Sequence, residues 1–153
     1  MTIRFYNIRD PHGYMSNFSR HPVVLYGKQW PTSEHFFQAQ KFAGTEHEER
    51  VRLATTPKEA ARIGRDRTLP LRVDWEDVKD NIMRVVVRAK FTQHIELRKQ
   101  LVATGDEDLV EATTDDDYWG CGESGGGKNM LGVVLVEVRA ELRNREDGHE
   151  SPA

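Results

Sequence analysis

The pattern of apolar and polar positions predicts a mostly helical chain with a few short strands. Near the N-terminus, apolar pieces at residues 3–6 and 23–26 are bounded by turn-forming Pro and Gly, which is typical of strands in a small sheet. From residue 32 onward, apolar residues recur at helical spacing behind Thr, Asp or Asn residues that can act as N-caps. The predicted helices cover residues 32–42, 45–54, 56–64, 74–105 with either a continuation or a break near His94, and 129–143.

The remaining segments complete the predicted fold. Residues 108–112 are predicted as a strand, and the valines among residues 129–143 favour a strand there as well, so that segment keeps two interpretations. The pattern as a whole predicts an α+β fold, mostly helical, with one compact domain over residues 1–143 and a small N-terminal β-sheet. The polar residues 144–153 are predicted to form a flexible tail.

Length and charge exclude several classes of protein. A chain of 153 residues fits one domain of ordinary size. Its 22 basic and 25 acidic residues give a net charge of −3, which argues against non-specific wrapping of duplex DNA. A single cysteine, no secretion signal and no apolar run of membrane-spanning length predict a soluble, cytoplasmic protein with no membrane partner.

A glycine-rich segment at residues 122–129 has the spacing G-x-x-x-x-G-K. Asn129 stands where a phosphate-loop hydrolase needs Ser or Thr for magnesium, and the segment follows polar residues instead of an apolar strand, so we predict no such hydrolase. Glycines nevertheless let backbone N–H groups approach a ligand, and a helix that begins at Asn129 would offer its positive end to an anion. A surface loop without a ligand is the alternative.

One face of the predicted helix 32–42 combines polar and aromatic residues. Glu34, Phe37, Gln38 and Lys41 share this face because spacings of three, four and seven residues return to nearly the same direction. Aromatic neighbours such as Trp30 favour the wall of a pocket. A solvated stripe with weak Glu–Lys pairs fits the same pattern, and the spacing does not decide between the two.

A second acidic group, Asp115, Asp116 and Asp117, precedes Trp119 and Gly120. Like charges this close raise the pKa of one carboxyl group in a dry pocket, whereas the same run in solvent is an ordinary loop. The six histidines include no H-E-x-x-H pair, and the single cysteine has no partner for metal binding. We therefore predict no metal and no cofactor.

Several motifs occur in an order that is specific to one family. They are SNFS at 16–19, GKQWPTSEHFFQAQK at 27–41, KF at 90–91, TG at 104–105, DDYWG at 116–120 and GKNMLG at 127–132. On these motifs the chain resembles the YbiA-like family, also called the NADAR family, over about residues 5–139. The resemblance implies cleavage of N-glycosidic bonds in ribosyl compounds. The substrates it implies are ribosylamino intermediates of riboflavin synthesis or ADP-ribosyl adducts of guanine.

The resemblance also implies which residues form the site. The catalytic positions match Glu34, Lys41 and Asp116, with Asp115 and Asp117 as alternatives for the last. The substrate-binding positions match Asn17, Trp30, Trp75, Trp119, Gly120 and Asn129.

The chemistry of these residue types suits an N-glycosidase. Breaking a C1′–N bond requires a proton for the departing base and a negative charge near the ribose, and two carboxyl groups can supply both. Lys41 either holds a phosphate or, as a neutral amine, attacks C1′. We predict a metal-independent hydrolase that acts on a ribosyl nucleotide or an ADP-ribose moiety, including one attached to guanine in DNA. A non-catalytic module that binds ADP-ribose and a protein-interaction domain are the alternatives.

Overall fold

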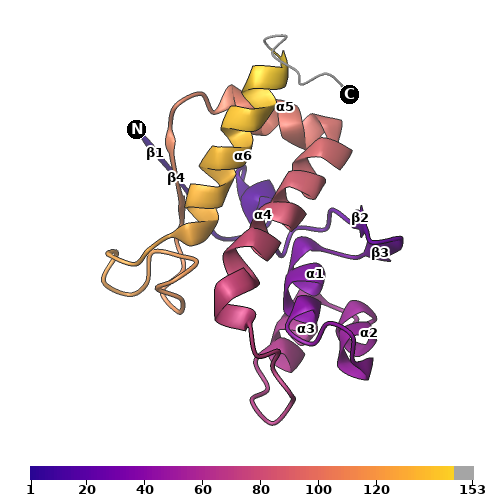
Figure 1. Ribbon diagram of the computed structural model, residues 1–153. Coiled ribbons are helices and arrows are strands. Elements are labelled where there is room, and N and C mark those ends of the chain that lie inside the picture. The colour runs from indigo at the N-terminus through magenta and orange to yellow at the C-terminus, as the bar shows by residue number, and fades with distance from the viewer. Residues whose placement is uncertain (147–153) are drawn as a thin grey trace. The chain divides into compact units, whose positions relative to one another are not determined.

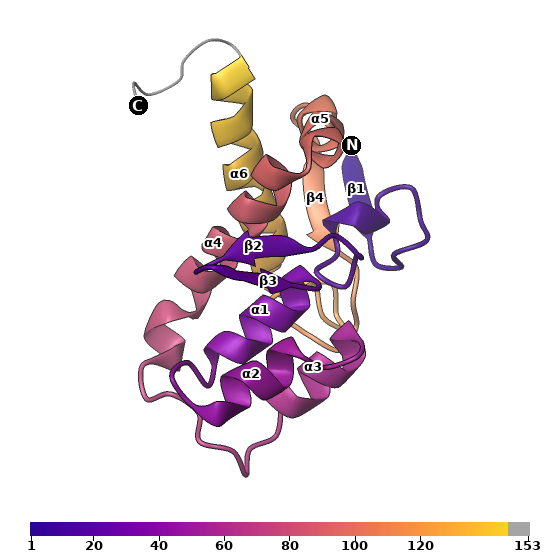
Figure 2. The same cartoon turned by 90° about the vertical axis from the view of Figure 1, so that its right-hand side faces the viewer.

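The computed structural model describes residues 1–146. These residues fall into two compact units: a central unit of residues 17–90, and a terminal unit that combines residues 1–16 with residues from 91 onward. Helices dominate both units, and the strands are short (Figures 1 and 2). The predicted mostly helical α+β class is confirmed.

The central unit begins with a tight β-hairpin. Strand β2 (Val23–Leu25) pairs antiparallel with β3 (Lys28–Trp30), and the turn between them places Tyr26 and Gly27 at positive φ. Two successive residues at positive φ make the kind of turn whose twist matches that of the two strands. The apolar pattern predicted β2 but missed β3, since the sequence of β3 is mostly polar.

Three short helices follow the hairpin and pack against one another: α1 (Ser33–Gln40), α2 (Glu46–Arg52) and α3 (Pro57–Gly64). Each begins after a threonine whose hydroxyl accepts a hydrogen bond from a first-turn backbone N–H. These caps, Thr32, Thr45 and Thr56, stand where the sequence predicts the helix starts. Every residue of α1 is buried, which makes it the central element of this unit.

The long predicted helix is two helices. Helix α4 (Trp75–Gln93) ends just before His94, whose extended backbone breaks the pattern, and α5 (Ile95–Ala103) follows. Of the two alternatives at His94, a continuation or a break, the structure has the break. None of the helices within the described residues is both long and apolar enough to cross a membrane, and a cytoplasmic location stays a prediction.

The terminal unit contains a separate two-stranded sheet. Strand β1 (Thr2–Phe5) pairs in parallel with β4 (Asp108–Glu111), with Thr2 opposite Asp108. The N-terminal strands therefore do not form one sheet: β1 pairs with a strand about one hundred residues later, whereas β2 pairs with β3. A parallel pair needs a long crossover between its strands, and no local pattern reveals which strand lies at the far end.

Helix α6 (Met130–Glu146) packs against β4 and α5. Its buried residues include Leu131, Leu135, Val138 and Leu142, so the helical spacing prevails over the strand preference of the valines. The helix continues three residues past the predicted end at Arg143, so residues 144–146 are helical where a flexible tail was predicted. The rest of that tail, residues 147–153, lies outside the described residues.

Lys90, near the end of α4, is almost completely buried. Burial lowers the pKa of its ammonium group to about 7, because desolvation penalises the charged form. The unfolded chain therefore binds more protons than the folded chain between about pH 7 and the ordinary lysine pKa. The shift is therefore a cost to the folded state that is absent above this window and grows as the pH falls through it.

Raising the pH from about 7 to about 9.5 is therefore expected to increase the free energy of unfolding by a few kcal/mol more in the wild type than in Lys90→Met. The methionine keeps the length of the side chain and cannot be protonated. Urea denaturation of both proteins at the two pH values measures the difference. Equal pH dependence in the two proteins would show that Lys90 does not titrate in this range.

Candidate active site

The polar stripe on α1 is buried. Glu34, Gln38 and Lys41 are each less than one-tenth exposed, so the interpretation of a solvated stripe is wrong. The Thr32 cap fixes the start of the helix, and the backbone N–H of Glu34 donates to the carbonyl of Asn17 at 3.1 Å. These contacts hold the carboxyl group of Glu34 at a defined place on the first turn.

Lys41 lies between the end of α3 and an aromatic ring. Its Nζ atom donates to the Gly64 carbonyl at 3.3 Å and lies 5.6 Å from the centroid of the Trp75 ring. Trp75 packs edge-on against Phe37 at 5.1 Å, so the ring is itself fixed by α1. The carbonyl end of a helix and an aromatic face both attract a cation, and together they set the position of the Lys41 amine.

Arg72 fastens the loop before α4 to the end of α1. Its backbone N–H donates to the Lys41 carbonyl at 3.0 Å, and its guanidinium donates to the Gln40 carbonyl at 3.3 Å. The same guanidinium forms a two-point ion pair with Asp74, which lowers the pKa of that carboxyl group. This pair places the first residue of α4, Trp75, beside Lys41.

Gln38 is a further buried residue on the same face of α1, and the sequence pattern predicted no role for it. Its Oε1 atom is buried and has no hydrogen-bond partner among the described residues. A Cβ atom on Gly64 would lie 2.0 Å from this oxygen and 2.9 Å from the Cβ atom of Gln38, so Gln38 would have to move before a side chain fits at position 64. The position of Gln38 on the shared helix face was the available signal, whereas its contact with Gly64 is set by the packing of α1 on α3.

Asn17 and Trp30 support α1 from within the core of the central unit. The side-chain amide of Asn17 donates to the sulfur of Met83 at 3.3 Å. The Trp30 ring is fully buried, donates from Nε1 to the Leu25 carbonyl at 3.1 Å and packs edge-on against Phe36. The structure gives Trp30 a packing role, and its contact with a substrate stays a prediction.

The second candidate group lies in the terminal unit, in the loop between β4 and α6. Asp116 is half-buried, and its Oδ1 atom accepts hydrogen bonds from the backbone N–H groups of Tyr118 at 2.9 Å and Trp119 at 2.8 Å. Asp115 and Asp117 are exposed. Of the three acidic residues, Asp116 alone has a carboxyl group fixed by its own loop, which favours it over its neighbours.

Asn129 connects the start of α6 to β4. Its backbone has a φ of 51°, its Oδ1 accepts from the Glu111 N–H at 2.9 Å, and its Nδ2 donates to the Leu109 carbonyl at 2.8 Å. Asn129 directly precedes α6, as predicted, but its side chain does not cap the helix, because both ends of that side chain bind the strand. Gly120 adjoins this connection: its carbonyl accepts from the Asn129 N–H, and a Cβ on it would lie 2.2 Å from Thr113.

The backbone N–H groups of residues 125–131, at the end of the glycine-rich loop and the start of α6, donate to other parts of the chain. The donors at residues 127, 128, 129, 130 and 131 bond to the carbonyls of Cys121, Asp117, Gly120, Tyr118 and Trp119, in that order. Since the N–H groups of Met130 and Leu131 are already satisfied by the loop before α6, the structure favours the alternative of a loop without an anion at this helix start. The loop instead folds back on the residues around Asp116 and holds them in place.

No group of three or more His, Cys, Asp or Glu side chains within residues 1–146 is arranged to hold a metal ion.

Asp116→Asn is expected to lower kcat by at least 10²-fold without unfolding the loop. The asparagine keeps an Oδ1 acceptor for Tyr118 and Trp119, and removes the charge alone. Asp115→Asn and Asp117→Asn are matched controls, one residue away on either side, and should stay within about twofold of the wild type. A larger loss in either control than in Asp116→Asn would transfer the role to that residue.

Comparison with known proteins identifies relatives over nearly the whole chain. The family model described as the NADAR domain matches residues 4–143. The N-glycosidase YbiA of Escherichia coli is 52% identical over 140 residues, which cover 92% of this chain and 88% of the relative. The NMR structure of E. coli YbiA superposes with a TM-score of 0.89 at 49% identity, covering 98% of this chain and 89% of that one. A riboflavin biosynthesis protein of Vibrio vulnificus is 41% identical over 92% of this chain, which spans 38% of the relative.

Proposed function

As a member of the NADAR family, the chain is a hydrolase of N-glycosyl bonds, and we propose that its substrate is a ribosylamino nucleotide of the riboflavin pathway. The identity to a riboflavin biosynthesis protein favours this substrate over an ADP-ribosyl adduct of guanine. The observation that carries the proposal is the buried stripe on α1, where Glu34 shares a helix face with an amine held by Gly64 and Trp75.

The reaction breaks the bond between C1′ of the ribose and the nitrogen of the base. The nitrogen takes a proton as it departs, and C1′ gains positive character until water adds its hydroxyl group there. Glu34, which is buried on α1, is the candidate for the group that gives this proton. Asp116 is the candidate for the carboxylate that faces the positive ribose.

Lys41 has two roles that its surroundings support. As an ammonium group it holds the phosphate of the nucleotide. As a neutral amine it attacks C1′ while the C1′–N bond to the base breaks and the base takes a proton. The C1′–O4′ bond of the ribose then opens, O4′ takes a proton from the amine nitrogen, and the open sugar is held as an imine. Water hydrolyses this imine and regenerates the amine. Trp75, whose ring lies against Lys41, offers an aromatic face to the ribose or the base.

The test offers the purified protein two substrates in parallel: the ribosylaminopyrimidine phosphate of the riboflavin pathway, and an oligonucleotide that carries ADP-ribose on guanine. Chromatography measures the free base and the free sugar. We expect turnover of the pathway intermediate, and loss of that turnover in Glu34→Gln. If the protein turns over the oligonucleotide and not the pathway intermediate, the proposal is wrong and the substrate is the ADP-ribosyl adduct. Binding of ADP-ribose without turnover of either substrate would favour the non-catalytic module.

A further inference from the structure

A groove in the central unit is lined by segments that the proposed chemistry does not use. It has a volume of about 620 Å³, within the range of roughly 300–1,000 Å³ that is typical of small-molecule sites. Its walls come from the segment before β2, from β3, from the start of α1 and from the turn between α2 and α3. The residue of α1 on its wall, His35, follows Glu34 by one position, and one residue corresponds to about 100° around the helix axis. The groove and the stripe of Glu34 and Lys41 therefore face different directions.

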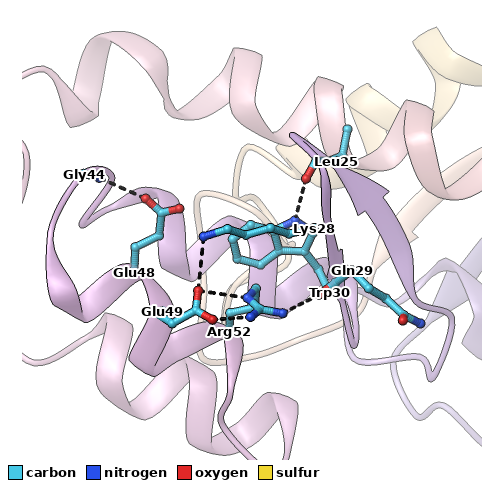
Figure 3. Close-up of polar contacts among 8 residues, drawn as sticks. All are labelled: Leu25, Lys28, Gln29, Trp30, Gly44, Glu48, Glu49 and Arg52. Atoms are coloured by element: carbon cyan, nitrogen blue, oxygen red, sulfur yellow. Dashed lines mark hydrogen bonds and ion pairs between the residues drawn. The ribbon is translucent and has the colours of Figure 1, made fainter.

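Two arginines line this groove and no carboxylate does. Arg20 is exposed and makes no ion pair or side-chain hydrogen bond with the residues that the structure describes. Arg52 is held in place: its guanidinium forms a two-point pair with Glu49 and donates to the Gln29 carbonyl at 3.2 Å (Figure 3).

The cluster around Arg52 retains a positive charge. Lys28 also pairs with Glu49, at 3.2 Å between Nζ and Oε2, so one carboxylate faces two cations (Figure 3). With the free guanidinium of Arg20 nearby on the same groove, the electrostatic potential favours an anion. A phosphate group is the anion whose geometry two guanidinium groups match best.

The rest of the groove is suited to a flat, apolar group. Pro22, Pro31, Leu53 and Pro57 line it. His35 forms part of the same wall as a neutral side chain, because burial lowers its pKa. Its Nε2 atom donates to the Ala54 carbonyl at 3.0 Å, which ties α1 to the turn before α3. A free phosphate would make no contact with this apolar part, so the groove fits a ligand that carries an apolar group beside its phosphate.

We propose that the groove is a second site, separate from the catalytic residues, that binds a nucleoside monophosphate. The phosphate lies between Arg20 and Arg52, and the base covers the prolines and Leu53. The absence of carboxylates from the lining excludes a cationic ligand on electrostatic grounds.

The test follows the backbone amide signals of the isotope-labelled protein by NMR during titration with AMP. We expect saturable shifts at Leu53, Thr55 and Thr56, whose amides border the groove. Arg20→Gln should weaken the binding about tenfold, because a charged hydrogen bond to phosphate contributes on the order of one such factor. Arg65→Gln, at an exposed arginine of the same unit outside the groove, should leave the affinity unchanged.

Three further measurements decide whether AMP binds at this second site. The shifts should persist in Glu34→Gln, which alters the catalytic stripe alone, and Arg20→Gln should retain the N-glycosidase activity of the wild type. Adenosine and inorganic phosphate should each bind at least tenfold more weakly than AMP. Equal binding of phosphate and AMP, or shifts that Arg20→Gln does not weaken, would overturn the proposal, and neither result would bear on the catalytic residues.

Discussion

Replacing Glu34 by glutamine is expected to lower kcat by about 10²- to 10⁴-fold, the range for loss of a general acid. The substitution keeps the size of the side chain and removes the proton that the departing base requires. The helix itself should persist, because Thr32 caps it and the Asn17 carbonyl accepts from the backbone N–H of residue 34 in either variant. Release of the base measures kcat, and circular dichroism with thermal unfolding confirms the fold.

Glu48→Gln is the matched control for this experiment. Glu48 is a half-buried glutamate of the same unit, on α2, and accepts a hydrogen bond from the Gly44 N–H at 2.9 Å (Figure 3). Glutamine can accept that bond too, so kcat should stay within about twofold of the wild type. Near-normal turnover in a correctly folded Glu34→Gln protein would remove Glu34 from the chemical step.

Lys41→Arg is expected to lower kcat by at least 10³-fold if Lys41 attacks C1′, because a guanidinium group keeps the charge and cannot form an imine. Reduction with borohydride during turnover should then leave the sugar attached to Lys41 in the wild type, and mass spectrometry of the digested protein locates the adduct. The neutral amine that this role requires must form against the attraction of the Gly64 carbonyl and the Trp75 ring.

Lys28→Arg serves as the control for charge-preserving substitution, since Lys28 forms a surface ion pair with Glu49 and should not affect turnover. Trapping in this variant should give the same adduct on Lys41. An enzyme that shows no adduct, and whose Lys41→Arg variant keeps substantial activity, would make Lys41 a phosphate anchor. Glu34 and Asp116 would then activate water directly.

Local signals predicted most of the helices. The hydroxyl groups of Thr32, Thr45 and Thr56 each accept a hydrogen bond from a backbone N–H in the next turn. Each helix start is therefore determined by residues that are close together in the sequence. Strand partners are different, because β1 and β4 are joined by hydrogen bonds between residues about one hundred positions apart. Asn129 shows the same limit: it is an ordinary capping residue in sequence, and its side chain bonds to β4.

In the candidate site, too, the sequence predicted the local arrangement and could not predict the contacts between distant residues. The shared face of Glu34, Gln38 and Lys41 follows from the period of the helix and was predicted. Whether that face is buried depends on the elements packed over it, and the spacing of residues along one helix gives no information about those elements. The contact between Lys41 and the Gly64 carbonyl joins two helices 23 positions apart, so only the fold could reveal it.

The tight fit between Gly64 and Gln38 means that these two positions cannot vary independently. A side chain at position 64 requires a shorter residue at position 38, so a double substitution such as Gly64→Ala with Gln38→Ser should be tolerated better than Gly64→Ala alone. The carbonyl of residue 64 also accepts a hydrogen bond from the Lys41 amine, so substitutions at this pair of positions are expected to shift the place of that amine.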